Sequence, residues 1–178
     1  MKLFIYGGSG SGKSAYAEKR AANLSKNRIY LATMKVFDEE DEERVNKHRN
    51  MRRELSFDTV EMPVDISNAL NSYYDGVVLV ECISNLVANE MFKDGKTYSS
   101  KDVAEKIIED INIIFQKAKN IVIVSNNIFE DGIEYDDYTK EYLKALGNIN
   151  THLSSFCDEV VEVVVGIPVE IKKYEKNN

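Results

Sequence analysis

The feature that most constrains this chain is a glycine-rich segment near its beginning, Gly7-Gly8-Ser9-Gly10-Ser11-Gly12-Lys13-Ser14. It fits the pattern G-x-x-x-x-G-K-[ST], and it stands where that pattern requires, between an apolar run at residues 3–6 and helix-forming residues at 14–24. Glycines permit backbone angles that turn successive N–H groups toward one anion, and a helix N-terminus adds partial positive charge. The segment therefore predicts a loop that binds the phosphates of a nucleotide.

Each residue of this loop is a candidate nucleotide-binding residue: Gly7, Gly8, Ser9, Gly10, Ser11, Gly12, Lys13 and Ser14. In this motif the lysine reaches the β- and γ-phosphates, and the serine hydroxyl ligates Mg²⁺. A bound Mg²⁺ also needs an acidic group at the end of a neighbouring strand, and Glu81 holds that place after the apolar run at 76–80. We therefore expect Ser14 and Glu81 to bind the metal. The alternative for Glu81 is a solvated carboxylate at the end of a strand.

Apolar runs that alternate with helical patterns indicate an α/β fold. Residues 76–80 and 121–125 are continuous, β-branched runs of the kind found in strands that are buried on both faces of a parallel sheet. Between them, apolar residues recur with a helical period over 100–118. We expect a mostly parallel sheet flanked by helices, with an antiparallel hairpin at the C-terminal edge. Further strands are predicted at 3–6, 28–34, 59–62, 160–165 and 169–171, and further helices at 14–24, 38–55 and 135–156.

Length and composition limit the remaining possibilities. A chain of 178 residues with 43% hydrophobic and 30% charged residues suits one domain, which we place at 1–173, followed by a polar tail at 174–178. The net charge of −7 disfavours nucleic acid as a partner, because a polyanion binder needs a positive field. No apolar stretch approaches the roughly 18 residues that span a bilayer, so we expect no membrane insertion and a cytoplasmic protein. Cys82 and Cys157 lie in apolar surroundings and are expected to be small buried residues, neither catalytic nor bridged.

A charged segment in the first third of the chain holds one of the two histidines. Six consecutive acids, residues 38–43, precede a basic stretch in which Arg44, His48 and Arg52 are four residues apart and share one face of a helix. Flanking cations lower the pKa of an imidazole and keep it neutral, hence nucleophilic, and the arginines can clamp a triphosphate. The alternative is a solvated, charged helix. The other histidine, His152, falls in an amphipathic pattern and is expected at the surface or in packing.

Taken together, these segments resemble the adenosylcobinamide kinase/adenosylcobinamide-phosphate guanylyltransferase family of cobalamin synthesis. The matching pieces follow the family's order over nearly the whole chain. They are Gly7 to Ser14, Tyr30-Leu-Ala-Thr33, Arg44-Val-Asn-Lys-His48-Arg49, Thr59-x-Glu61-x-Pro63, Val80-Glu81-Cys82-Ile83-Ser84 with Asn89, Val124-Ser125-Asn126, Gly132-Ile133, Gly147-x-x-Asn150, Asp158-Glu159-Val160 and Gly166-x-Pro168-x-x-x-Lys172.

This resemblance implies two chemistries in one domain that is built on a RecA-type sheet. A nucleoside triphosphate, ATP or GTP, would phosphorylate the aminopropanol hydroxyl of adenosylcobinamide. GTP would then guanylylate a histidine, matched here by His48, and the GMP would pass to the cobinamide phosphate to give adenosylcobinamide-GDP. Lys13, Arg49 and Arg52 join His48 as the expected catalytic residues.

The resemblance also implies the remaining partners and binding residues. Thr33, Glu61 and Glu81 join the loop as nucleotide-binding residues. The expected substrates are a nucleoside triphosphate and a cobinamide-type corrinoid, the expected cofactor is Mg²⁺, and the chain is expected to form a homo-oligomer.

Two departures from the family pattern keep other functions open. Where the family has Ser-Asn-Glu, this chain has Ser125-Asn126-Asn127, so an amide replaces the carboxylate. Where the family has Arg-x-Phe-Arg-Asp, this chain has Lys140-Glu141-Tyr142-Leu143-Lys144. One alternative is another small-molecule kinase that uses the phosphate loop without a covalent step. A second is a nucleotide-binding regulatory protein that has lost catalysis. A nucleic-acid motor is disfavoured because the chain is small and acidic and has no interleaved aromatic and basic residues.

Overall fold

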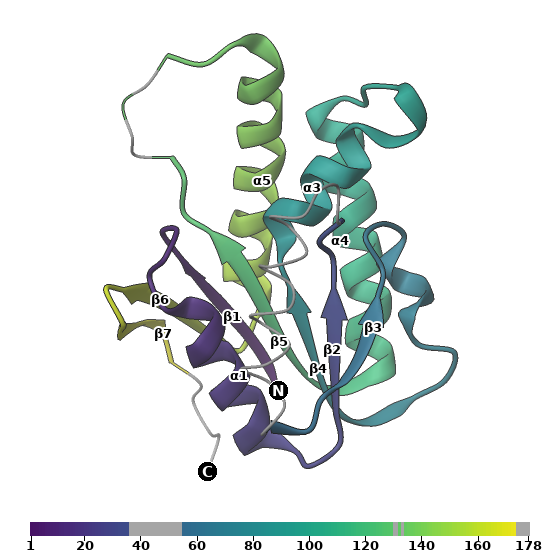
Figure 1. Ribbon diagram of the computed structural model, residues 1–178, viewed down its shortest axis with the longest axis vertical. Helices are drawn as coiled ribbons and strands as arrows, with labels where there is room; N and C mark the ends of the chain where they lie inside the picture. The colour runs from purple at the N-terminus through teal and green to yellow at the C-terminus, as the bar shows by residue number, and fades with distance from the viewer. Residues whose placement is uncertain (36–54, 130–131, 133, 174–178) are drawn as a thin grey trace.

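The computed structural model describes residues 1–35, 55–129, 132 and 134–173. Within these ranges the chain forms one seven-stranded sheet in the order β3-β2-β4-β5-β1-β6-β7 (Figure 1). Strands β1 to β6 are parallel, and β7 runs antiparallel to β6, which confirms the mostly parallel sheet with a C-terminal hairpin at its edge. The strands are β1 (Lys2–Gly7), β2 (Arg28–Ala32), β3 (Asp58–Glu61), β4 (Tyr74–Glu81), β5 (Ala118–Asn126), β6 (Glu159–Val164) and β7 (Ile167–Lys172).

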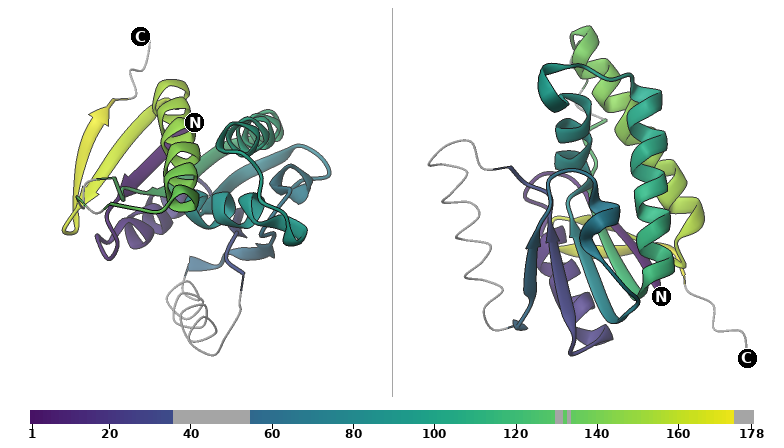
Figure 2. Two further views of the ribbon diagram at one scale, coloured as in Figure 1. Left: turned by 90° about the horizontal axis from the view of Figure 1, so that it is seen from above. Right: turned by 90° about the vertical axis from the view of Figure 1, so that its right-hand side faces the viewer.

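Helices cover both faces of the sheet, as Figure 2 shows from two further directions. Helix α1 (Lys13–Leu24) packs on one face, and α3 (Ile83–Met91), α4 (Ser100–Lys117) and α5 (Asp137–Phe156) pack on the other. Two short 3-10 helices, η2 (Ile66–Ala69) and η3 (Lys93–Gly95), connect these elements. No helix in the described ranges has an apolar stretch long enough to cross a membrane.

The two central strands show why their sequences are continuously apolar. In β4, Val77 and Leu79 pack toward α1, whereas Val78 and Val80 pack toward the three helices on the other face. All four side chains are at most 1% exposed, and β5 repeats the same alternation over residues 121–124. Because both faces are covered, each position must be apolar, and each such side chain contributes about 1.5–3 kcal/mol through burial.

The main differences from the sequence prediction are one additional helix and shifted strand bounds: β4 and β5 begin two and three residues earlier than predicted, and β2 ends two residues earlier. The helix predicted at 38–55 lies outside the described residues apart from residue 55. Helix α3 was not predicted, because it has only nine residues and its N-cap, Cys82, supplies no side-chain capping bond. Strand β7 begins at Ile167, two residues earlier than expected, because Val165 and Gly166 alone make the turn after β6 with φ of 44° and 84°. Pro168 is accommodated in β7 because an edge strand has no partner on its outer side.

A bidentate ion pair joins the helix that follows the phosphate loop to the sheet. Arg20 on α1 donates from Nη1 and Nη2 to the two carboxylate oxygens of Glu159 on β6, at 2.6 and 2.8 Å. The Glu159 side chain is 10% exposed, so its charge depends on this partner. The pair raises the pKa of Arg20 further above its ordinary value, mainly through the hydrogen bond to Glu159.

We predict that Arg20→Ala lowers the free energy of unfolding by about 3 kcal/mol, because it leaves the Glu159 carboxylate buried without its cation. The matched control is Lys101→Ala, which removes an exposed pair with Glu105 and should cost less than about 0.5 kcal/mol. Urea denaturation measures both variants. Equal losses in the two would contradict the assigned importance of the buried pair.

Candidate functional site

The glycine-rich loop opens into a cavity of about 480 Å³ at the carboxyl ends of the strands. The loop leaves β1 at Gly7 and enters α1 at Lys13, as the sequence predicts. The cavity is lined from the loop and first helical turn by Ser9, Gly10, Ser11, Gly12, Lys13, Ser14 and Ala15, and from the rest of the fold by Tyr30, Met34, Glu81, Cys82, Asn85 and Asn126. Six of the eight predicted loop residues therefore face one cavity.

The loop has the backbone geometry of an anion-binding turn. Gly10 and Gly12 have φ of 68° and 88°, a region that favours glycine. Within the loop the Ser11 N–H donates to Gly8 O at 3.2 Å. Gly12 is the N-cap of α1, and among the described residues no side chain caps it and no acidic residue occupies the first turn. The N–H groups of this helix end are thus left to a ligand, and the helix dipole favours an anion.

Lys13 supplies a partly buried cation to this cavity. Its Nζ donates to Gly8 O at 3.1 Å, which holds the side chain back over the loop. Burial lowers the pKa of Lys13, while the nearby Cys82 thiol and Glu81 carboxylate act in the opposite direction. An ammonium group that has lost part of its hydration gains more from an added anion than an exposed one does. Lys13 is therefore well placed to bind phosphate oxygens.

Glu81 lines the same cavity but is placed differently from the prediction. Strand β4 ends at Glu81, and β5 lies between β4 and β1. The carboxylate is therefore on the second strand from β1, not on the strand next to β1. Its Oε2 atom is buried and has no hydrogen-bond partner in the described structure. A buried carboxylate oxygen without a donor fits a cation or a metal-bound water.

The metal site would take few protein ligands. Among the described residues, no three His, Cys, Asp or Glu side chains gather in a way that could hold a metal ion. Mg²⁺ is commonly held by one or two protein side chains together with phosphates and water. Ser14 and Glu81 both line the cavity and would supply two such side chains. The residues present therefore fit Mg²⁺ bound together with a nucleotide.

Two other predicted nucleotide-binding residues do not line the cavity. Thr33 is fully buried, its Oγ1 donates to Cys82 O at 2.8 Å, and its N–H donates to Glu81 O at 3.0 Å. It holds the segment that carries Glu81 rather than facing a ligand. Glu61 is exposed at the end of the edge strand β3, with three strands between β3 and β1.

Polar residues at the ends of β4 and β5 join the site, although the sequence analysis did not assign them to it. Asn126 ends β5, and its Nδ2 donates to Ser84 Oγ at 2.7 Å. Ser84 Oγ also lies 2.9 Å from the sulfur of Cys82. Asn126 could have been found from the sequence, because it ends an apolar strand run and the carboxyl ends of parallel strands meet at one edge of the sheet.

The two cysteines have different environments. Cys157 is fully buried, as predicted, whereas Cys82 is partly exposed and lines the cavity. Both are free thiols. Burial of the sulfur raises the pKa of Cys82, and burial raises the pKa of Cys157 to about 12, which favours the neutral thiol over the thiolate in both.

The structure describes only one of the two histidines. His48 lies outside the described residues, together with Arg49 and Arg52, so their roles stay predictions. His152 on α5 is partly buried and stacks on Phe156, with ring centroids 5.7 Å apart. This stacking is a packing contact, one of the two positions, surface or packing, that were expected for it.

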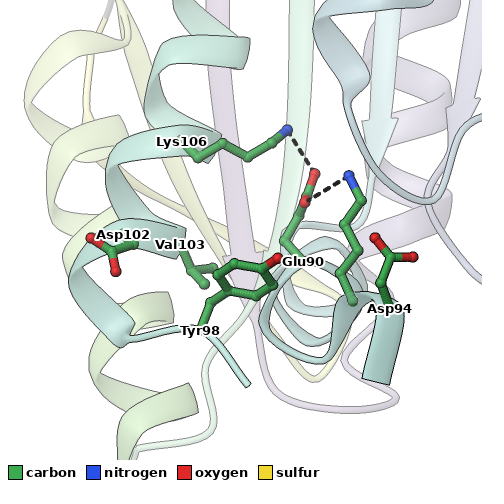
Figure 3. A pocket seen from close by; sticks show the side chains of 7 residues that line it. Glu90, Asp94, Tyr98, Asp102, Val103 and Lys106 are labelled. Carbon is green, nitrogen blue, oxygen red and sulfur yellow. Dashed lines mark ion pairs between the residues drawn. The ribbon is translucent and has the colours of Figure 1, made fainter. Parts of the chain in front are cut away.

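A second cavity, of about 390 Å³, lies where α3, η3 and α4 meet. Figure 3 shows the Glu90 carboxylate there between two ammonium groups. Glu90 is 4% exposed and pairs with Lys106 at 2.7 Å and Lys93 at 3.8 Å, and Asp65 pairs with the same two lysines. Lys106 also pairs with Asp110 on its own helix at 2.6 Å. These ion pairs fasten α3 to α4, so this cavity presents a structural ion-pair network.

Comparison with known proteins gives one family across the chain. The family model described as cobinamide kinase / cobinamide phosphate guanyltransferase matches residues 3–171. The chain is 27% identical to the bifunctional adenosylcobalamin biosynthesis protein CobU of Escherichia coli (strain K12) over 183 residues, covering 97% of this chain and 100% of that protein. It is 26% identical to the bifunctional adenosylcobalamin biosynthesis protein CobP of Pseudomonas aeruginosa over 174 residues, covering 97% and 98%.

Two solved structures match most of this chain, and one of them does so with a TM-score above 0.5. An ATPase from the type III secretion system of pathogenic bacteria matches 95% of this chain with a TM-score of 0.53 and 10% identity, and this chain spans 56% of it. The flagellar accessory protein FlaH from Methanocaldococcus jannaschii matches 97% of this chain and 78% of its own with a TM-score of 0.48 and 12% identity. The ATPase likeness agrees with the α/β phosphate-loop fold.

We predict that Thr33→Val lowers the free energy of unfolding by about 1 kcal/mol, because the buried hydrogen bond to Cys82 O is lost while the side-chain shape is kept. Thr59→Val, at an exposed position of β3, is the matched control and should be neutral or slightly stabilising. Thermal denaturation should show a lowering of about 2–4 °C for Thr33→Val alone. An unchanged midpoint would mean that the hydroxyl does not hold this segment.

Proposed function

The chain belongs to the cobinamide kinase / cobinamide phosphate guanyltransferase family, and we propose that it performs both reactions. In the first it phosphorylates adenosylcobinamide with a nucleoside triphosphate. In the second it transfers GMP from GTP to the resulting phosphate, giving adenosylcobinamide-GDP. The observation that carries this proposal is the phosphate-loop cavity, which is lined by Lys13, Ser14 and Glu81 in a chain that matches the family almost from end to end. One carboxylate oxygen of Glu81 has no hydrogen-bond partner among the described residues.

For the kinase step, we propose that the loop holds the triphosphate while the acceptor hydroxyl attacks the γ-phosphorus. An oxygen–phosphorus bond forms, the bond from the γ-phosphorus to the β–γ bridging oxygen breaks, the nucleoside diphosphate leaves, and the hydroxyl proton passes to water. The N–H groups of the loop and the Lys13 ammonium bind the β- and γ-phosphate oxygens and stabilise the charge that builds up on them. Ser14 and Glu81 hold Mg²⁺, which supplies further neutralisation of the phosphate oxygens. Positioning and charge account for most catalysis in reactions of this class.

For the guanylyl step, we propose that the neutral imidazole of His48 attacks the α-phosphorus of GTP. A nitrogen–phosphorus bond forms, the bond to the bridging oxygen breaks, and pyrophosphate leaves. A phosphate oxygen of cobinamide phosphate then attacks the guanylyl group and releases the histidine. Arg49 and Arg52 stabilise the phosphate charge in this proposal. Its support is the match of the segment Arg44-Val-Asn-Lys-His48-Arg49 to the family pattern.

Homo-oligomer formation is part of the same proposal. The edge strand β7 and the turn before it expose four apolar side chains in a row of alternate residues: Val165, Ile167, Val169 and Ile171, at 84, 62, 42 and 54%. An exposed apolar edge strand is a surface that proteins usually cover.

The guanylyl-histidine is tested by labelling. We predict that the chain retains label after incubation with Mg²⁺ and GTP labelled at the α-phosphate, followed by denaturation, and that His48→Ala retains none. The label should be labile to acid, as a nitrogen–phosphorus bond is. His152→Ala is the matched control because it removes the other histidine, and it should label as the natural chain does.

Three outcomes would count against this proposal. A natural chain that binds GTP but acquires no label would exclude the covalent step and favour a kinase without it. Equal label on His48→Ala and the natural chain would place the guanylyl group on another residue. Binding without turnover on any cobinamide would instead favour the regulatory alternative.

For Glu81 we predict that Glu81→Gln lowers the kinase rate about 10–100-fold and raises the Mg²⁺ concentration needed for half the maximal rate, because an amide replaces a charged metal-binding oxygen. Glu105→Gln, on the exposed surface of α4, is the control and should keep the natural rate. Initial rates over a range of Mg²⁺ concentrations measure both. An unchanged Mg²⁺ dependence in Glu81→Gln would remove Glu81 from the metal site.

A further inference from the structure

The β6–β7 hairpin reaches past the end of β1 and lies against the phosphate loop. The parallel register pairs Tyr6 with Glu162, so Val163 comes level with Gly7, the last residue of β1, and Val164 continues beyond β1 alongside the loop. The close packing is visible at Gly7, where an added Cβ would stand 2.4 Å from the carbonyl oxygen of Val163. Figure 1 shows this hairpin at the edge of the sheet, next to β1.

The turn of the hairpin makes a backbone hydrogen bond to the loop. The Gly166 N–H donates to Ser11 O at 2.8 Å, across 155 positions of the sequence. Next to it, an added Cβ on Gly12 would stand 3.5 Å from the Cα of Gly166. Gly166 has φ of 84°, and this left-handed conformation belongs to the tight turn that links β6 to β7. The turn therefore fixes where the Gly166 N–H points.

This bond sets the orientation of one peptide group in the loop. The peptide bond between Ser11 and Gly12 is trans and planar, so its carbonyl and its N–H point in opposite directions. When Ser11 O is held on Gly166, the N–H of Gly12 must turn away from the hairpin. Gly12 lines the cavity, where a phosphate-binding loop needs its N–H groups to converge.

We propose that Gly166 is a positioning residue for nucleotide binding: through Ser11 O it orients the Gly12 N–H toward the phosphates. The inference rests on the proposed function in that it takes a nucleoside triphosphate as the ligand of the loop. The hairpin thus belongs to the nucleotide site although none of its residues lines the cavity.

The test compares two glycines under the same backbone strain. Gly166→Ala and Gly95→Ala both place a Cβ on a residue in the left-handed region, with φ of 84° and 71°, and at neither would the Cβ meet another described atom within 4 Å. Only Gly166 contacts the phosphate loop, because Gly95 lies in η3. We expect the dissociation constant for GTP with Mg²⁺, measured by calorimetry, to rise about tenfold for Gly166→Ala and to stay unchanged for Gly95→Ala.

Three further measurements separate positioning from a general loss of stability. Gly166→Asn should recover most of the affinity, since asparagine tolerates the left-handed region better than alanine does. In the kinase assay, Gly166→Ala should raise KM for the nucleotide and leave KM for adenosylcobinamide unchanged. Amide hydrogen exchange on the natural chain, which needs no variant to fold, should show the Gly166 N–H protected.

The opposing outcomes are distinct from failure of the proposed function. An equal change in affinity for the two alanine variants, an equal rise in both KM values or an unprotected Gly166 N–H would overturn the positioning role while the natural chain still binds GTP. A natural chain that binds neither GTP nor ATP would overturn the proposed function, and the positioning role with it.

Discussion

The candidate site depends on the parallel pairing of β1 with β5 on one side and β6 on the other. Because these strands are apolar and buried, the backbone hydrogen bonds of the ladder determine where each strand ends. The pairing places Asn126 beside Gly7 and carries β6 beyond Tyr6. The loop after β1 is therefore supported on both sides by backbone. Asn127 N–H donates to Gly7 O on one side, and Gly166 N–H donates to Ser11 O on the other.

Above this apolar layer, short polar side chains connect the ends of the strands. Ser125 Oγ lies 2.7 Å from Asn150 Oδ1, and Asn150 in turn donates to Asn126 O at 3.3 Å. Asn126 reaches Ser84 on α3, and Thr33 donates to the carbonyl of Cys82. Buried polar groups need hydrogen-bond partners, and in this network the polar groups at the strand ends are partners for one another. The network holds the ends of β2, β4 and β5 in register, so that Glu81 and the loop face one cavity.

The sequence predicts best what is local. The loop of residues 7–14, the continuous strands β4 and β5 and the helical period of α4 are all written in consecutive residues, and the structure confirms them. The position of Glu81 required the strand order, since β5 is inserted between β4 and β1, and no local pattern encodes that order. Thr33 was assigned from the resemblance to the family, and its burial could not be seen in the sequence, because its carbonyl accepts from Asn89 on α3, a helix too short to give a clear period. The contact between Gly166 and Ser11 joins residues 155 apart, and only the folded sheet brings them together.

The same structure accounts for the two departures from the family pattern. At Asn127 this chain has an amide where the family has a carboxylate, and its Nδ2 lies 3.3 Å from Glu162 Oε1 on β6. A glutamate there would set two carboxylates against each other beside the phosphate loop, and like charges at this range repel. The altered stretch Lys140-Glu141-Tyr142-Leu143-Lys144 also has partners: Glu141 accepts from the Ser100 N–H at the start of α4, and Tyr142 donates to Ser84 O at 3.3 Å. Both departures therefore fit contacts of this fold, and a loss of catalysis is not needed to explain them.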